Sequence, residues 1–201
     1  MTLIKTACCA LALGTIVALP AKALLIDDPS FERKASLDSA TSGKSGMGNP
    51  GAADIQTAFP TDPWTKEGEL TSNGANDLLT VSLTSGNWGD DTVAGTWSIA
   101  ASFWTTYGEG VISMHVGGGK VDGTGQRDDA NPEWFAWQIT QGETSGTFSL
   151  TRKSGGGGGI SNLKLWGRGE PQETTTVPDG GASLALLGLG LAAVGAIRRK
   201  A

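Results

Sequence analysis

The chain has 201 residues, and its 20 acidic and 15 basic side chains leave a formal net charge of −5. Nineteen of the acids but only ten of the bases fall between residues 24 and 176, so this part carries a net charge of −9. Such an acidic body argues against nucleic acid and anionic lipid as partners, because binding to phosphates needs clustered lysine and arginine.

The first 23 residues are typical of a secretory signal peptide. Lys5 precedes an apolar stretch over residues 7–19, and the small residues Ala21 and Ala23 form a cleavage site. We therefore expect export of the chain, with cleavage after Ala23.

The composition predicts one all-β domain behind this leader. Without the leader and a C-terminal tail, about 150 residues remain, which is enough for a single domain with its own core. Cys8 and Cys9 are the only cysteines and lie in the leader, so the processed domain depends on core burial rather than on disulfides. The 31 glycines and seven tryptophans, with short apolar runs between glycine-rich turns, are typical of β-sheet.

The domain begins with a polar segment, residues 24–63, which is rich in Ser, Gly, Ala, Asp and Pro. We expect an edge strand at Leu24–Ile26 and then a long irregular loop over residues 36–63. From Trp64 onward, apolar runs alternate with turn residues. These runs predict strands over residues 78–84, 96–104, 111–116, 134–140, 146–151 and 160–166.

Alternation within the runs assigns the side chains to two faces. Two sheets of half-apolar strands that pack face to face make a jelly-roll-like β-sandwich over residues 64–169, where no run has the period of an amphipathic helix. A short linker, residues 170–176, follows. The side chains expected to face the core are Trp97, Ile99, Ala101, Phe103, Ile112, Met114, Val116, Phe135, Trp137, Ile139, Phe148, Leu150, Leu163 and Leu165.

The opposite faces of the strands carry a candidate carbohydrate-binding surface. Indole rings stack on pyranose rings, and amide groups reach sugar hydroxyls. The alternative is that residues 24–63 or loops cover this face, which would make the same side chains ordinary core. The candidate residues are Trp104, Trp134, Gln138, Asn162 and Trp166.

Two further kinds of site involve titratable residues. His115, the only histidine, is expected to be a half-buried strand residue, because Ser113 on the same strand face is too close along the chain for a Ser-His-Asp arrangement. Asp122, Asp128 and Asp129 are candidate calcium ligands in a glycine-containing loop, and solvated loop charge is the alternative.

A glycan hydrolase would need two carboxylates that face each other across a cleft. Glu109, Glu133 and Glu143 lie in turns or at strand ends rather than on inward-facing rows. We therefore expect no enzymatic activity, and no cofactor other than the candidate calcium.

The C-terminal residues 177–201 form a signal in three parts. An apolar run over residues 182–197 would span about 24 Å as a helix, somewhat less than the roughly 30 Å of a bilayer core. We expect this run to be a transmembrane helix, with the basic residues after it acting as a cytoplasmic stop-transfer signal. The motif before the run is Val177, Pro178, Asp179, Gly180 and Gly181, and the basic end is Arg198, Arg199 and Lys200.

This order resembles the C-terminal signal of the PEP-CTERM proteins of Gram-negative bacteria, in its Val-Pro-Asp variant. Val177, Pro178 and Asp179 match the start of that signal, whereas Gly180 and Gly181 depart from the usual Pro-Ser and are similar to the GlyGly-CTERM signal cut by a rhomboid-type protease. The resemblance implies recognition by an exosortase, a membrane cysteine transpeptidase. It further implies transient residence in the inner membrane, delivery to the cell surface or outside the cell, and a setting of exopolysaccharide and biofilm.

These observations together predict an exported, non-enzymatic protein with a structural or adhesive role in the extracellular matrix. A carbohydrate-binding module that uses the outward-facing tryptophans is the first alternative, and a secreted glycan hydrolase is the second.

Overall fold

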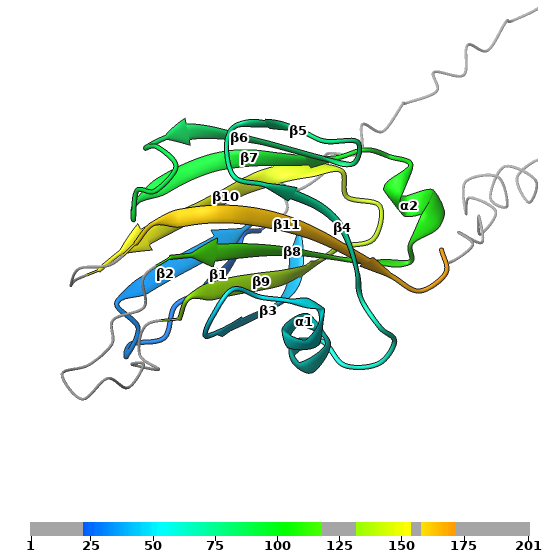
Figure 1. Ribbon diagram of the computed structural model, residues 1–201, viewed down its shortest axis with the longest axis horizontal. Coiled ribbons are helices and arrows are strands. Elements are labelled where there is room, and N and C mark those ends of the chain that lie inside the picture. The colour runs from blue at the N-terminus through cyan, green and yellow to red at the C-terminus, as the bar shows by residue number, and fades with distance from the viewer. Residues whose placement is uncertain (1–21, 118–131, 154–157, 172–201) are drawn as a thin grey trace, which may run out of the picture.

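The computed structural model describes residues 22–117, 132–153 and 158–171. Within these residues, strands form two antiparallel sheets that pack face to face (Figure 1). The first sheet has six strands, in the order β1 (Leu24–Ile26), β2 (Arg33–Leu37), β10 (Ser145–Arg152), β7 (Val93–Ile99), β6 (Leu79–Ser85) and β5 (Gly74–Ala75). The second has five, in the order β3 (Ala40–Gly46), β9 (Trp134–Ile139), β8 (Glu109–Val116), β11 (Ile160–Arg168) and β4 (Thr65–Leu70). The predicted all-β, two-sheet sandwich is confirmed.

The main core lies between the two sheets and is filled by the alternating apolar residues of the strands. On β10, Phe148 and Leu150 point inward, and on β11, Leu163 and Leu165 do the same; all four are at most 2% exposed. Every side chain predicted to face the core lies in this cluster except Ala101, which is exposed in the turn after β7. The period-2 pattern therefore predicted the inward faces correctly, because each buried strand face must be apolar.

The strand predicted over residues 96–104 is wrong at its C-terminal end. β7 ends at Ile99, and the chain turns into α2 (Phe103–Thr106), a helix of a single turn. The turn is closed by a hydrogen bond from Phe103 N to Ala100 O of 2.9 Å. Phe103 still packs in the main core from α2. An apolar residue at this position is therefore compatible with a helix as well as with the predicted strand.

The long loop predicted over residues 36–63 is also wrong. This segment contains the end of β2, all of β3 and α1 (Ala52–Ala58), and the two strands join opposite sheets of the sandwich. β2 lies between β1 and β10 and buries Ala35 and Leu37. β3 is an edge strand that pairs only with β9. Its polar sequence is compatible with this position, because an edge strand is exposed to solvent on one side.

No helix in the described parts of the chain is long and apolar enough to cross a membrane. The predicted span at residues 182–197 lies outside the described residues, as do residues 1–21 of the predicted signal peptide.

Candidate functional site

An arm of the chain, residues 47–64, covers the outer face of the second sheet. It contains α1, which lies on the outside of the sandwich beside β3 (Figure 1). Ile55 and Phe59 of the arm pack in a second apolar cluster with Trp134 of β9 and Trp166 of β11. The second sheet is therefore buried on both faces over this area.

The helix α1 begins at Ala52, directly after a capping glycine. The Asp54 carboxylate accepts a hydrogen bond of 2.8 Å from Gly51 N. This contact satisfies a backbone donor at the helix start and places a negative charge in the first turn, where the helix dipole favours it. The short helix thereby has a defined start above the sheet.

The predicted row of three exposed tryptophans is not formed. Trp134 and Trp166 do point away from the main core, as alternation required, but the arm covers them and they are only 5% and 2% exposed. Trp104 lies on α2 instead of on a strand, and its Nε1 donates to Glu143 O at 2.7 Å. The three rings therefore offer no common face on which a sugar chain stacks.

The two candidate amide groups differ in their partners. Gln138 Nε2 donates to Glu109 Oε2 at 2.9 Å, and its Oε1 accepts from Ser42 Oγ at 3.3 Å. Asn162 is only 6% exposed. Within the described residues its Oδ1 has no hydrogen-bond partner, so of the two amide groups only Gln138 is bonded to neighbouring strands.

A buried lysine holds the start of the arm. Lys164, on β11, donates to Asn49 Oδ1 at 2.6 Å and to Pro50 O at 2.9 Å, and it is only 5% exposed. Burial lowers the pKa of its ammonium group, with Glu69 opposing the shift. An ammonium group removed from water needs such oxygen partners, so this contact fixes the arm in place.

A buried arginine holds the end of the arm. Arg168 Nη1 donates to the backbone oxygens of Phe59 at 2.8 Å, Pro60 at 3.1 Å and Asp62 at 3.3 Å. Its Nη2 donates to Glu109 Oε2 at 2.6 Å. The planar guanidinium group can bind several oxygens at once, a geometry that lysine lacks.

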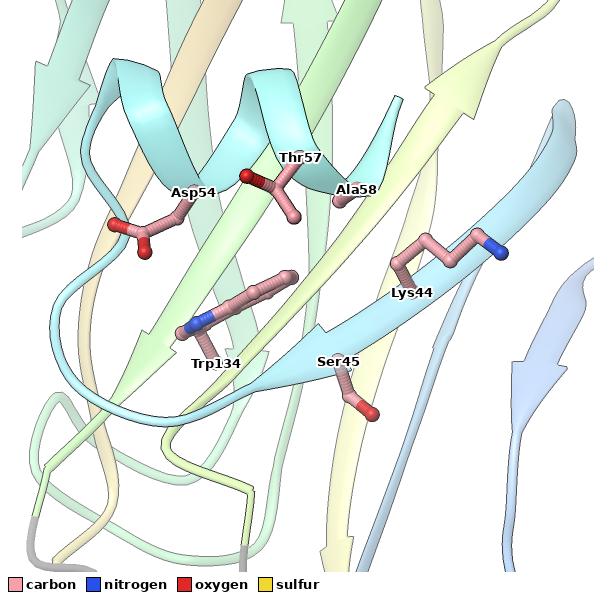
Figure 2. Close-up of a pocket in the computed structure, with 6 residues that line it drawn as sticks. All are labelled: Lys44, Ser45, Asp54, Thr57, Ala58 and Trp134. Carbon is pink, nitrogen blue, oxygen red and sulfur yellow. The ribbon is translucent and has the colours of Figure 1, made fainter. Parts of the chain in front are cut away.

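A small pocket remains where the arm meets the edge of the sheet (Figure 2). It lies between α1 and β3, and the Trp134 ring lies beneath the helix in this space. Its volume of about 210 Å³ is below the roughly 300–1,000 Å³ of sites for drug-sized ligands. It therefore suits one small group with polar edges. The lining residues are Lys44, Ser45, Asp54, Thr57, Ala58 and Trp134.

Gly46 packs closely against the Trp134 ring. A Cβ atom at this position would overlap the indole ring, so the glycine allows close packing. Trp134 Nε1 donates to Met47 O at 3.1 Å, which fixes the ring plane. The pocket is thus bounded by a rigid aromatic group. Its lysine, carboxylate and hydroxyl rim had no signal in the sequence, because β3 and α1 were expected to be loop.

His115 is half-buried, as predicted, and lies on the outer face of β8. Its Nδ1 is 2.5 Å from Ser161 Oγ, whereas Ser113 Oγ accepts from Trp166 Nε1 at 2.8 Å. Burial, followed by the charge of Lys164, lowers the pKa of His115. The histidine and Ser113 therefore have separate partners and form no catalytic pair.

Two of the carboxylates considered for a hydrolase, Glu109 and Glu133, lie far apart along the sheet. Glu109 begins β8, whereas Glu133 directly precedes β9, and the antiparallel pairing puts them at opposite ends of these two strands. Glu109 is bound to Arg168, and Glu133 Oε2 accepts from Gly48 N at 2.5 Å. Glu109 and Glu133 therefore do not form the carboxylate pair of a glycosidase.

The candidate calcium ligands Asp122, Asp128 and Asp129 lie outside the described residues. Within the described ranges, no group of three or more potential metal ligands comes together. Two acidic side chains from other acidic pairs have basic partners instead, Asp27 with Lys153 and Asp91 with Arg152.

The fold and the arrangement of these residues define a β-sandwich domain with an internally braced outer face. Comparison with family models adds the C-terminal part: residues 176–201 match the VPDSG-CTERM motif, a PEP-CTERM-like sorting signal. In this chain Gly180 stands where that motif has serine. No curated protein and no solved structure matches the chain. The sorting signal points to export toward the cell surface and to processing by an exosortase-like enzyme.

Proposed function

We propose that this chain is an exported protein with a structural or adhesive role at the cell surface or in an exopolysaccharide matrix. The observation that carries this proposal is the sorting motif at residues 176–201. A compact, cysteine-free, acidic sandwich ahead of that motif suits an extracellular component, because its stability comes from two apolar clusters and needs no disulfide.

The proposal includes two processing steps. An N-terminal signal peptide is removed after Ala23, and an exosortase-like transpeptidase removes the tail after transient insertion in the inner membrane, so that the mature chain lacks residues 182–201. Intact-mass measurement of the protein from its native host tests both steps. A mass that retains residues 182–201 in the membrane fraction would refute tail removal and indicate a single-pass anchor.

Carbohydrate binding is a second candidate, favoured by the pocket beside Trp134. An aromatic group with an ammonium, a carboxylate and hydroxyl groups around it suits one sugar unit at the end or edge of a glycan. The proposed ligand differs from that of an open stacking face, since only a small part of the ring is accessible.

Affinity electrophoresis in gels that contain the host's own exopolysaccharide tests this second candidate. Lys44→Ala and Thr57→Ala change exposed side chains at the pocket and should release the domain from retardation without lowering its melting temperature. Lys34→Ala, on β2 of the other sheet, is the matched control and should remain retarded. Unretarded parent protein would leave only the structural role.

A further inference from the structure

The chain enters and leaves the sandwich at the same end. Leu24, at the start of β1, pairs with Leu37 at the end of β2. The turn after β2 contacts the turn after β9, because Thr140 N donates to Ser39 O at 2.8 Å. The preceding residue, Ile139, pairs with Gly110 at the start of β8.

The last strand ends beside this same group of turns. Arg168 pairs with Glu109, next to Gly110, and Gly108 N donates to Gly169 O at 3.2 Å. Figure 1 shows α2 beside the end of β11. We name this the α2 end, formed by residues 38–39, 99–108, 140–144 and 168–170.

The strand directions agree with this placement. β1 runs away from the α2 end, because its residues 24–26 pair in turn with residues 37–35. β11 runs toward it, from Ile160 beside Val116 to Arg168 beside Glu109. The two segments with targeting signals therefore both connect to the domain at the α2 end.

We propose that the α2 end is the tethered end of the exported domain and faces the membrane and its processing enzyme, while the opposite end is displayed to extracellular partners. This inference rests on the proposed export and sorting, and it adds which surface is free. The displayed end is formed by residues 27–32, 86–92, 116–117, 132–133, 152–153 and 158–159.

The length of the connection supports this orientation. Five residues lie between Pro171 and Val177, and the six steps from one Cα atom to the next reach at most about 20–22 Å when fully extended. The nine residues of β11 themselves span about 30 Å. The attachment point lies at the α2 end whether the tail remains a membrane anchor or is cut near the motif, so the displayed end stays the same.

Charge also favours a domain that stands off the bilayer. Asp38, Asp62, Glu143 and Glu170 lie at or next to the α2 end. Binding to anionic lipid headgroups needs clustered lysine and arginine, so these negative side chains give the α2 end no electrostatic attraction to lipid.

The displayed end is braced from inside by one buried arginine. Arg33 is 1% exposed and donates to Gly158 O at 2.9 Å, and to Pro132 O and Gly117 O at 3.3 Å each. Arg33 belongs to β2 of the first sheet, and its three acceptors flank β8, β9 and β11 of the second sheet. One guanidinium group thus links the two sheets at this end. Such bracing holds the described backbone of this end in one arrangement for a partner.

Thiol labelling on intact host cells tests the orientation. Ala101→Cys places a thiol at the α2 end, in the turn after β7, and Ser85→Cys places one next to the displayed end, at the last residue of β6; both positions are exposed. Cys8 and Cys9 lie in the predicted leader, so the unaltered chain serves as the blank. The probe is a bulky, membrane-impermeant maleimide. For each variant, the labelling rate on cells is divided by the rate measured for the same folded protein after its release from the surface, and this ratio is the normalised rate.

We expect this normalised rate to be several-fold higher for Ser85→Cys than for Ala101→Cys. Equal rates, or faster labelling of Ala101→Cys, would overturn the proposed orientation while leaving export intact. Labelling of both variants only after cell disruption would instead refute export itself, and the orientation with it.

Discussion

The guanidinium group of Arg168 lies over the indole ring of Trp64, 4.1 Å from the ring centroid. This contact joins the last strand of the sandwich to the end of the arm, residues 47–64, and shields the hydrogen bonds that Arg168 makes to the arm backbone. Arg168 therefore holds the end of the arm, while Lys164 holds its start.

Arg168→Lys should lower the free energy of unfolding by about 2–3 kcal/mol, because lysine cannot bind three carbonyl groups and Glu109 while it stacks on Trp64. Urea unfolding followed by tryptophan fluorescence measures the change. Lys66→Ala, which breaks an exposed ion pair with Glu69, is the control and should cost no more than about 1 kcal/mol. Equal losses in the two variants would contradict the role assigned to Arg168.

Gly46→Ala should cost about 1–3 kcal/mol, since the added methyl group overlaps the Trp134 ring and the ring is held by its bond to Met47. We expect a changed near-ultraviolet circular dichroism signal together with a lower melting temperature. Gly117→Ala is the matched control, because a Cβ atom there is 3.9 Å from its nearest neighbour, Gly159 O. A parent-like Gly46→Ala variant would show that the ring moves freely.

Phe148→Asp or Leu165→Asp should each unfold the domain. Both side chains are at most 2% exposed in the main core, and an unpaired buried charge costs several kcal/mol against a total stability of about 5–15 kcal/mol. Circular dichroism of the purified variants tests this. Thr96→Asp, on the exposed face of β7, should retain the sheet spectrum. A folded Phe148→Asp variant would contradict the inward assignment of its strand face.

Stability should fall as the pH is lowered through the range below about 6.5, where an unperturbed histidine gains its proton. The folded pKa of His115 is lowered by burial and by Lys164, while Glu133 and Glu69 oppose the shift, so the unfolded chain binds this proton more readily. The stability from neutral His115 is present above the unfolded pKa and is lost as the pH falls toward the folded pKa.

The comparison of urea midpoints at pH 7.5 and pH 5.5 measures this dependence, because most carboxylates remain ionised over that interval. His115→Gln removes the titrating group and should reduce the difference between the two midpoints. An unchanged difference in the variant would assign the pH dependence to other groups.

The strands that flank the main core were predictable because each presents one face to apolar neighbours. In β9, β10 and β11 the period-2 rows that end in Ile139, Leu150 and Leu165 are local properties of the chain. β2 and β3 were missed for the opposite reason: both are short of apolar residues, and such a segment looks like loop until its partner strands are known.

The candidate site shows the same division. Alternation correctly placed Trp134 and Trp166 on the face away from the main core, but nothing local indicated that Ile55 and Phe59 would cover them. Covering depends on contacts between residues that are distant in the sequence, such as Lys164 and Pro50, which are 114 positions apart. The same strand pattern is compatible with a solvent-exposed outer face and with a buried one, so the pattern alone does not decide between them.

The sequence by itself determined the sorting motif and the two-sheet class of the domain, because linear order and the period of two are both written in neighbouring residues. Only the tertiary structure decided that the tryptophans are core, that Arg168 and Lys164 hold the arm, and that both ends of the domain meet at the α2 end. These features arise from burial and hydrogen bonding between distant segments, whose free energies depend on the complete packing of the chain.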